Sequence, residues 1–361
     1  MSKADAIRVG IIGAGRVGVD WHARDIPRAG GRVVALADSV PGRAGRHAER
    51  LGLEHAFDDP QALIDHPDVD AVAVCTPPHV HLPLAEAVLA TGKPLYLEKP
   101  PALTAEDMRR IAAAAERSES IMFVGSNLIY RPEIQYLRAA LDAGRFGEVY
   151  HLEAFKLFRA NAKRGWHRLK AVAGGGVGMD STAHRIEQVL YLLPGLRSGS
   201  VTARTSDHFV HRPVPPPKEH DYQLMDVAEA TYQEEPEADV EDALVAFVQF
   251  DAGPTLMLRD AAGAHMPDHQ AFRLFGTEAG ASMQPLTIHH TGPAGEIGDE
   301  QPDLPEPPQG THTPAYEHFF DCIRRGEPTD SPPERAVRVM QLIGAIYASA
   351  ADAGRPVRFG D

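Results

Sequence analysis

A glycine-rich stretch that directly follows an apolar segment places the strongest constraint on the fold. Residues 7–12 have the apolar pattern of a buried strand, and they lead into Gly13-Ala-Gly15-Arg-Val-Gly18. This GxGxxG spacing is informative when it lies between a strand and a helix, as the pattern here predicts. We expect Gly13 to form the tight turn, Gly15 to let the backbone approach a pyrophosphate, and Gly18 to let the helix pack closely on the sheet.

A second apolar segment, RVVALAD, ends on Asp38. A carboxylate at this point accepts hydrogen bonds from both ribose hydroxyls of a dinucleotide and repels a 2′-phosphate. Asp38 therefore favours NAD, while the neighbouring Ser39 and Arg43 leave NADP open. A glycine turn without a ligand is the alternative, and the combination of strand, helix, second strand and terminal Asp makes it the weaker one.

Strands and helices continue to alternate as far as residue 125, which predicts a parallel, doubly wound sheet in a domain of residues 1–125. Ligands of such sheets bind beyond the carboxyl ends of the strands. The residues expected to contact the cofactor there are Gly13, Gly15, Arg16, Val17, Asp38, Thr76, Pro77, His81, Glu98 and Lys99.

Composition narrows the classes of function. The formal net charge is −14, so nucleic acid and anionic membranes would repel the chain. The N-terminus has no signal-peptide layout, and no segment has the roughly 20 apolar residues of a membrane span. Cys75 and Cys322 lie far apart and suggest neither a disulfide framework nor a zinc site. We expect a cytoplasmic α/β protein without a bound metal.

The segment GGGVGMDSTAH, residues 174–184, places four glycines just before an Asp and a His. The apolar spacing that follows predicts a helix over residues 180–193, which puts Asp180 and His184 one turn apart on the same face. The glycines would let the main chain approach the nicotinamide or the substrate. The structural alternative is a helix-start carboxylate followed by a half-buried histidine.

Several motifs in order make the chain similar to the Gfo/Idh/MocA oxidoreductases, relatives of glucose-fructose oxidoreductase and inositol dehydrogenase. They are GAGRVG, CTPPHVHLPLAEAVLATGKPLYLEKP, GGGVGMDSTAH, VEDALVAFVQFDAG, LFGTEAG and the C-terminal segment from EHFFDCIRR. The resemblance covers nearly the whole chain. It implies a Rossmann domain followed by an α/β domain with a large, mostly antiparallel open sheet, here residues 126–361.

The resemblance also implies site residues. Its catalytic lysine falls on Lys99 in the Glu-Lys-Pro turn, and its Asp and His fall on Asp180 and His184. Glu187 stands where the family usually has Asp, and it could orient His184. The residues expected beside the substrate are Asn127, Arg131, Trp166 and His167.

Two proline-rich and acidic stretches, residues 212–242 and 297–314, are predicted to be solvated loops, with a lid or a subunit contact as the alternative. The amphipathic C-terminal segments are expected to be core helices. The open sheet of the family often supports oligomerisation, so we expect a homodimer or homotetramer through the C-terminal sheet.

The function expected from these features is hydride transfer between NAD(P) and a secondary alcohol or ketone of a sugar, polyol or cyclitol. Within the family, a glycosidase with tightly bound, recycled NAD is an alternative. A non-catalytic, nucleotide-sensing regulator is another, and the presence of Lys99, Asp180 and His184 together argues against it.

Overall fold

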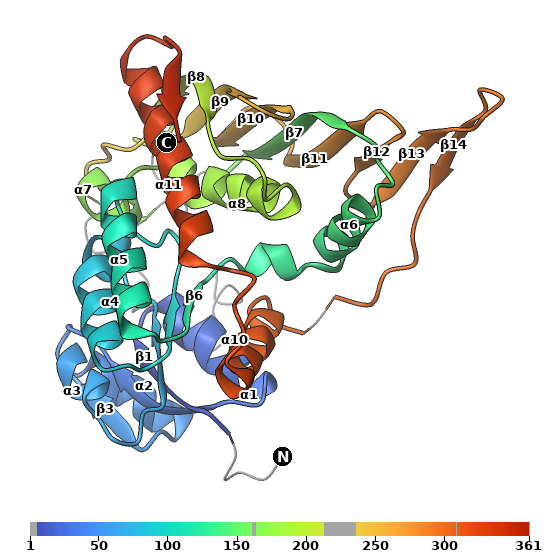
Figure 1. Ribbon diagram of the computed structural model, residues 1–361. Coiled ribbons are helices and arrows are strands. Elements are labelled where there is room, and N and C mark those ends of the chain that lie inside the picture. The colour runs from blue at the N-terminus through green and yellow to red at the C-terminus, as the bar shows by residue number, and fades with distance from the viewer. Residues whose placement is uncertain (1–5, 161–163, 213–235, 308, 361) are drawn as a thin grey trace. The chain divides into compact units, whose positions relative to one another are not determined.

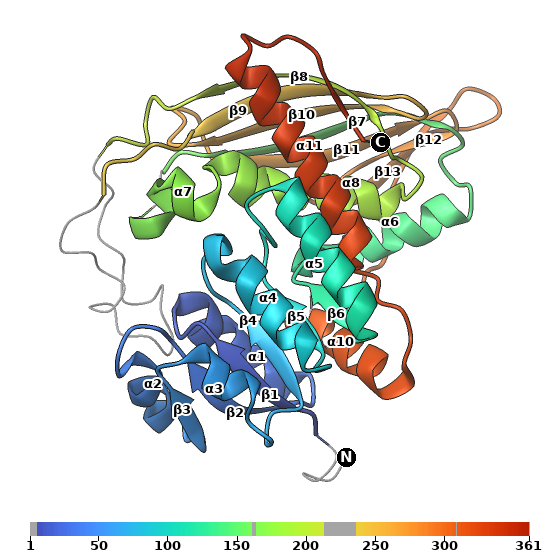
Figure 2. The ribbon, with the colours of Figure 1, turned by 60° about the vertical axis from the view of Figure 1, so that its left-hand side comes forward.

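The computed structural model describes residues 6–160, 164–212, 236–307 and 309–360, and these residues form two compact units. The first unit contains the chain up to residue 127 together with residues 309–337, and the second contains the rest. Figures 1 and 2 show the sheet of each unit from two directions. Most of the first proline-rich, acidic stretch, residues 213–235, lies outside the described residues.

A six-stranded parallel sheet in the order β3-β2-β1-β4-β5-β6 forms the centre of the first unit. The strand order reverses at β1, which has β2 on one side and β4 on the other, so the sheet is doubly wound as predicted. The strands are β1 (Arg8–Ile12), β2 (Arg32–Ala37), β3 (His55–Phe57), β4 (Ala71–Val74), β5 (Leu95–Leu97) and β6 (Met122–Val124).

Helices connect these strands. Thr104 caps α5: its hydroxyl accepts from the Asp107 main-chain nitrogen at 3.0 Å and donates to the Asp107 carboxylate at 2.8 Å. The helices of this unit are η1 (Val17–His22), α1 (Ala23–Arg28), α2 (Arg43–Leu51), α3 (Pro60–Ile64), η2 (Pro78–Val80), α4 (His81–Ala90), α5 (Ala105–Ser118) and α10 (Thr313–Arg325), and α11 (Pro333–Ala351) begins here.

The C-terminal helix α10 belongs to the core of the first unit. The Tyr316 ring stacks on Tyr96 of β5 with centroids 4.5 Å apart, and Phe319 meets the same tyrosine edge-on. All three side chains are completely buried. Just after α10, the hydroxyl of Ser331 donates to the carbonyl oxygen of Val124 at the end of β6. Apolar burial therefore joins a segment from the end of the sequence to the N-terminal sheet.

The second unit contains a nine-stranded sheet in the order β14-β13-β12-β11-β7-β10-β9-β8-β15. It is antiparallel except for the pair β7 and β10, which confirms the predicted mostly antiparallel sheet. The strands are β7 (Val149–Phe158), β8 (Gly199–Ser206), β9 (Ala243–Phe250), β10 (Thr255–Ala262), β11 (His269–Gly276), β12 (Ala279–Ser282), β13 (Thr287–Thr291), β14 (Ile297–Glu300) and β15 (Val357–Phe359).

The prediction of a loop over residues 297–314 was wrong at both ends. Ile297–Glu300 form β14, because their main chain pairs with Thr287–Thr291 and extends the sheet by one strand. At the other end, α10 begins at Thr313, with Pro314 in its first turn, where proline is tolerated. The residues described between these two elements, 301–307 and 309–312, have no regular secondary structure.

One face of the large sheet is covered by helix α8 (Figure 2). Inward and outward side chains alternate along β9 and β10, as a sheet with one packed face requires. The helices of the unit are η3 (Asn127–Tyr130), which begins in the first unit, α6 (Pro132–Asp142), η4 (Gly165–Arg168), α7 (Lys170–Ala173), η5 (Gly178–Thr182), α8 (Ala183–Leu192) and the end of α11. No helix among the described residues has the length and apolar character of a membrane span.

Helix α8 is preceded by a π-helical turn, η5, that is attached to β10. Asp260 on the packed face of β10 accepts hydrogen bonds from the hydroxyls of Ser181 at 2.7 Å and Thr182 at 2.6 Å. Burial raises the pKa of the Asp260 carboxyl, and the two hydroxyl donors counteract part of that increase. These bonds fix the start of the helix on the sheet.

The glycines before η5 are explained by neighbours within the chain. The carboxylate of Glu241 accepts from the main-chain nitrogens of Gly176 at 2.9 Å and Gly178 at 2.8 Å, and from the Tyr347 hydroxyl at 2.8 Å. A Cβ at Gly176 would overlap the carbonyl oxygen of Glu241, and a Cβ at Gly175 would overlap the Tyr347 hydroxyl. The close approach expected of a ligand is made here by Glu241 and Tyr347.

We predict that Gly176→Ala destabilises the protein by about 1–3 kcal/mol or more, the usual cost of overpacking. The added methyl group would meet main-chain atoms of Glu241, which cannot move away as a side-chain end can. Gly195→Ala is the matched control, because nothing lies within 4 Å of the Cβ that it would add. Chemical denaturation of both variants measures the difference. Equal unfolding free energies would contradict the account of the glycines.

Candidate active site

The loop after β1 has the shape that a dinucleotide needs. Gly13 has a φ of 104°, a left-handed conformation that favours glycine, and it makes the tight turn. A Cβ at Gly18 would overlap the carbonyl oxygen of Gly13, so Gly18 is required for close packing. A Cβ at Gly15 would meet nothing within 4 Å. The space beside Gly15 is therefore open on the side where a pyrophosphate would lie.

Asp38 lies at the end of β2 next to this loop, and 7% of it is exposed. Its Oδ2 accepts from the Ala14 main-chain nitrogen at 2.9 Å, and its Oδ1 accepts from that of Val40 at 2.8 Å. The guanidinium of Arg43 is 3.4 Å from Oδ1. The carboxylate is thus fixed beside the glycine loop, where it suits a ribose better than a 2′-phosphate.

The other residues predicted at the cofactor lie at the same end of the sheet. Arg16 is exposed, and Val17, Thr76 and Pro77 are partly exposed. His81 is completely buried, and its Nε2 lies 2.8 Å from the carbonyl oxygen of Thr76. Burial lowers the pKa of His81, and the hydrogen bond to Thr76 opposes that shift. The position of His81 suits a support for the loop better than a direct ligand contact.

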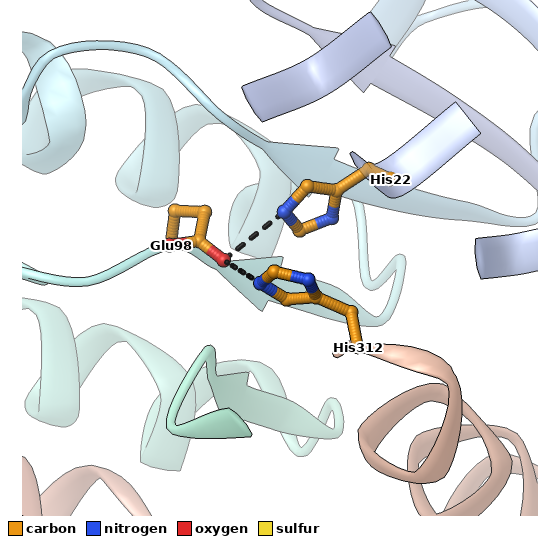
Figure 3. A group of neighbouring side chains, drawn as sticks. All are labelled: His22, Glu98 and His312. Carbon is orange, nitrogen blue, oxygen red and sulfur yellow. Dashed lines mark hydrogen bonds and ion pairs between the residues drawn. The ribbon is translucent and has the colours of Figure 1, made fainter. Parts of the chain in front are cut away.

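Lys99 is the one accessible residue of a buried turn. In the stretch 95–102, which includes β5 and the residues after it, every residue except Lys99 is buried. Glu98 points into the core, where its carboxylate meets His22 and His312 (Figure 3). Its second oxygen accepts from the main-chain nitrogen of Lys99 at 3.0 Å.

Asp180 and His184 of the second unit are, like Lys99, accessible residues within a buried stretch. Along residues 175–192, these two are the only residues that are not buried. Asp180 lies in the π-helical turn η5, and His184 lies in the first turn of α8. Single π-helical turns are rare and often mark functional sites. Glu187, expected to orient His184, is buried.

The four residues predicted at the substrate are all partly exposed. Asn127 begins η3, and Arg131, just before α6, forms an ion pair with Glu133 at 3.2 Å. Trp166 and His167 lie together in η4 with their rings stacked, centroids 3.6 Å apart. Lys99 and Asn127 belong to the first unit, and the other predicted catalytic and substrate residues belong to the second.

Two groups of described residues have nitrogen and oxygen atoms close enough together to hold a metal ion. One is His22, Glu98 and His312, all buried, and the other is His55, His66 and Asp68. Asp68 is also ion-paired with Arg8 at 2.7 Å. Neither group was identified from the sequence, because each joins segments that are not adjacent in the chain.

Two family models match consecutive parts of the chain. The model for the oxidoreductase family with an NAD-binding Rossmann fold matches residues 7–126, and the model for the GFO/IDH/MocA C-terminal domain matches residues 134–282. The chain belongs to the Gfo/Idh/MocA family. The resemblance stated from its motifs is thereby confirmed.

Individual relatives have the same organisation. The chain is 27% identical to D-glucoside 3-dehydrogenase of Escherichia coli K12 over 95% of both chains. It is 23% identical to scyllo-inositol 2-dehydrogenase (NAD(+)) of Bacillus subtilis over 89% of this chain and 87% of the relative. A solved structure of levoglucosan dehydrogenase in complex with NADH shares the fold, with a TM-score of 0.85 and 22% identity over 99% of this chain and all of that one.

These findings confirm several predictions. The N-terminal domain is an NAD-binding Rossmann domain, and the chain is a nicotinamide-dependent oxidoreductase that acts on CH–OH groups. The open space at Gly15 and the fixed carboxylate of Asp38 fit that cofactor.

The glycine loop gives a paired prediction. Gly15→Ala should leave the unfolding temperature nearly unchanged and weaken NADH binding about tenfold or more, because its methyl group enters the open space at the pyrophosphate position. Gly18→Ala should instead destabilise the fold, because its methyl group meets the main chain of Gly13. Thermal unfolding and fluorescence titration with NADH separate the two effects. Undiminished NADH binding by Gly15→Ala would contradict the assignment of the loop.

Proposed function

We propose that this protein is a dehydrogenase that uses NAD to oxidise a secondary alcohol of a sugar, polyol or cyclitol, or to reduce the corresponding ketone. The observation that carries the proposal is the pattern of exposure at the three candidate catalytic residues. Lys99 is the accessible residue of one buried stretch, and Asp180 and His184 are those of another. The named relatives act on glucosides and inositols, which supports this substrate class.

Each residue has a role suited to its chemistry. Bound NAD supplies the hydride acceptor. His184 takes the proton of the substrate hydroxyl, since an imidazole titrates near neutral pH. Lys99 donates a hydrogen bond to the same oxygen and stabilises its developing negative charge. Asp180 accepts a hydrogen bond from a neighbouring substrate hydroxyl. Either Lys99 or His184 can be the formal base, because both side chains can exchange a proton with the substrate hydroxyl.

Asn127, Arg131, Trp166 and His167 complete the proposal as substrate-contacting residues. Their partial exposure leaves polar atoms and ring faces available to hydroxyl groups. Arg131 is held by Glu133 and can still direct the remaining donors of its guanidinium to a substrate.

The proposed reaction can be tested by measuring turnover. Purified protein mixed with NAD⁺ and a panel of cyclitols, sugars and sugar acids should generate NADH absorbance with at least one compound, and more slowly with NADP⁺ because of Asp38. Tightly bound nucleotide that survives dialysis, together with cleavage of a glycoside, would favour the glycosidase alternative. Nucleotide binding without turnover of any compound, in Lys99→Met and wild type alike, would favour a regulator.

The proposed role of Lys99 can be tested by substitution. Lys99→Met should lower kcat by about 10²–10⁴-fold while the dissociation constant of NADH stays within about twofold. Lys170→Met is the control, because Lys170 is an exposed lysine outside the predicted site. Steady-state kinetics and fluorescence titration provide the measurements. Turnover by Lys99→Met at the wild-type rate would remove this residue from the mechanism.

The face of the large sheet opposite helix α8 supports a homodimer or homotetramer. On this face Val245, Phe247 and Met257 are 52%, 38% and 38% exposed, and Phe247 lies opposite Met257 on the neighbouring strand. In Figure 2 helix α8 of the same unit lies on the other face. The Arg259 guanidinium, 5.6 Å from the Phe155 ring centre, lies beside these apolar side chains. A second copy of the same face offers both apolar and π partners to this surface.

Phe247→Glu should therefore shift the protein to a smaller species in light scattering after size-exclusion chromatography. The carboxylate introduced at position 247 would be buried against the same residue of the second copy, with no opposite charge to pair with. Ile297→Glu is the control, since Ile297 is an 88% exposed apolar residue on β14. An unchanged mass for Phe247→Glu would place the interface elsewhere.

The cytoplasm stays a prediction for the location of this protein. Cys75 and Cys322 are both free, buried thiols. Unpaired cysteines suit a reducing compartment.

A further inference from the structure

Behind the Glu98–Lys99 turn lies a buried cluster of polar side chains from three parts of the sequence (Figure 3). Glu98 Oε1 is 3.0 Å from His22 Nε2 and 3.3 Å from His312 Nε2. His22 ends the π-helical turn η1, and His312 directly precedes α10. The exposed fractions are 0% for His22, 5% for Glu98 and 3% for His312. Water therefore has little access to these groups.

The protons of this cluster can be assigned from its contacts. Burial acts to raise the pKa of Glu98, but hydrogen bonds from His22 and His312 outweigh it and hold that pKa well below its usual value. Glu98 is thus an anion, and both histidines donate from Nε2. His22 then accepts from the Tyr316 hydroxyl, 2.5 Å from its Nδ1. Burial lowers the pKa of His22, which agrees with a neutral ring.

His312 is held in its donor position from several sides. Its main-chain nitrogen donates to the carboxylate of Asp25 at 2.9 Å, and its Nδ1 is 3.0 Å from the Thr311 hydroxyl. Its ring stacks on Trp21 with centroids 5.7 Å apart. Asp25 is itself buried and paired with Arg24 at 2.7 Å. These contacts fix the orientation of His312 independently of its bond to Glu98.

The two carboxylate oxygens of Glu98 accept hydrogen bonds from different partners. Oε1 accepts from the histidines, and Oε2 accepts from the main-chain nitrogen of Lys99. The room for this side chain depends on Gly125, where a Cβ would come within 2.8 Å of Glu98 Oε1. A change at either histidine therefore acts on the main chain that carries Lys99.

We propose that His22 and His312 are positioning residues, which hold the Glu98 carboxylate and through it fix the place from which Lys99 acts on the substrate. This inference rests on the proposed catalytic role of Lys99. It assigns a part in the reaction to a residue of the stretch 297–314, which the sequence predicts to be a solvated loop.

The same three side chains could instead bind a metal ion, since their ligand atoms converge. The hydrogen bonds account for every one of those atoms: two donors meet one carboxylate oxygen, and Tyr316 satisfies the second nitrogen of His22. We therefore favour the hydrogen-bonded cluster, and the experiment below includes the metal as an outcome.

The test compares His312→Leu with His312→Gln in the full-length protein. Leucine removes the donor to Glu98, whereas the glutamine amide can replace it. We expect His312→Leu to lower kcat about tenfold or more, because a small displacement of a catalytic group is costly, and His312→Gln to recover most of the loss. The substrate KM and the dissociation constant of NADH should stay within about twofold in both variants.

His318→Leu is the matched control. His318 lies on α10 six residues after His312, and its Nε2 accepts from the main-chain nitrogen of Asp330 at 3.0 Å. This variant should lower the unfolding temperature and keep kcat within about twofold of the wild type, measured below that temperature. Circular dichroism confirms that each variant is folded at the assay temperature.

Three results would overturn the proposal. The first is a kcat of His312→Leu within twofold of the wild type while Lys99→Met is inactive, which leaves the proposed function standing. The second is a loss of activity in His312→Leu and His312→Gln alike, matched to their loss of folded protein as in His318→Leu. The third is about one metal ion per chain by mass spectrometry that is lost in His312→Leu. Full activity of Lys99→Met would instead remove Lys99 from the proposed mechanism, and with it the premise of this inference.

Discussion

The buried carboxylate of Glu98 determines much of the arrangement in the first unit. Removing a charge from water is costly unless hydrogen bonds replace the lost hydration. Here His22 and His312 provide those bonds on one oxygen, and the main chain of Lys99 provides one on the other. The helix α10 must pack against β5 for His312 to reach Glu98. The stacked rings of Tyr96 and Tyr316 contribute the apolar burial that holds it there.

The second unit uses carboxylates in a similar way. Glu241 accepts two main-chain hydrogens from the glycine stretch, and Asp260 accepts two hydroxyl hydrogens from η5. Both carboxylates hold the segment of residues 175–192, in which only Asp180 and His184 are accessible. In both units, then, an acidic side chain that faces the protein fixes the backbone, and the titratable groups that face outward are left to meet ligands. This separation lets packing set the geometry without using the reactive atoms.

Much of this was predictable where the cause is local in the sequence. The GxGxxG loop specifies its own turn through Gly13 and its own packing through Gly18, and Thr104 caps α5 with a partner three residues away. Lys99, Asp180 and His184 were proposed as site residues from the sequence because they lie in short motifs. The short strand β14 was missed, since four residues rich in charge and glycine form a strand only because β13 offers its edge.

The residues that hold the site could not be found in this way. His22 and Tyr316 are 294 positions apart, and Glu241 follows Gly176 by 65, so no periodicity or spacing connects them. The four glycines illustrate the consequence. Their spacing correctly indicated a close approach, but the sequence cannot distinguish a ligand from Glu241 and Tyr347 as the neighbour. A residue that contacts a ligand must meet a fixed chemistry and so falls in a recognisable motif. A residue that positions another needs only to meet it in space, and it becomes visible once the fold is known.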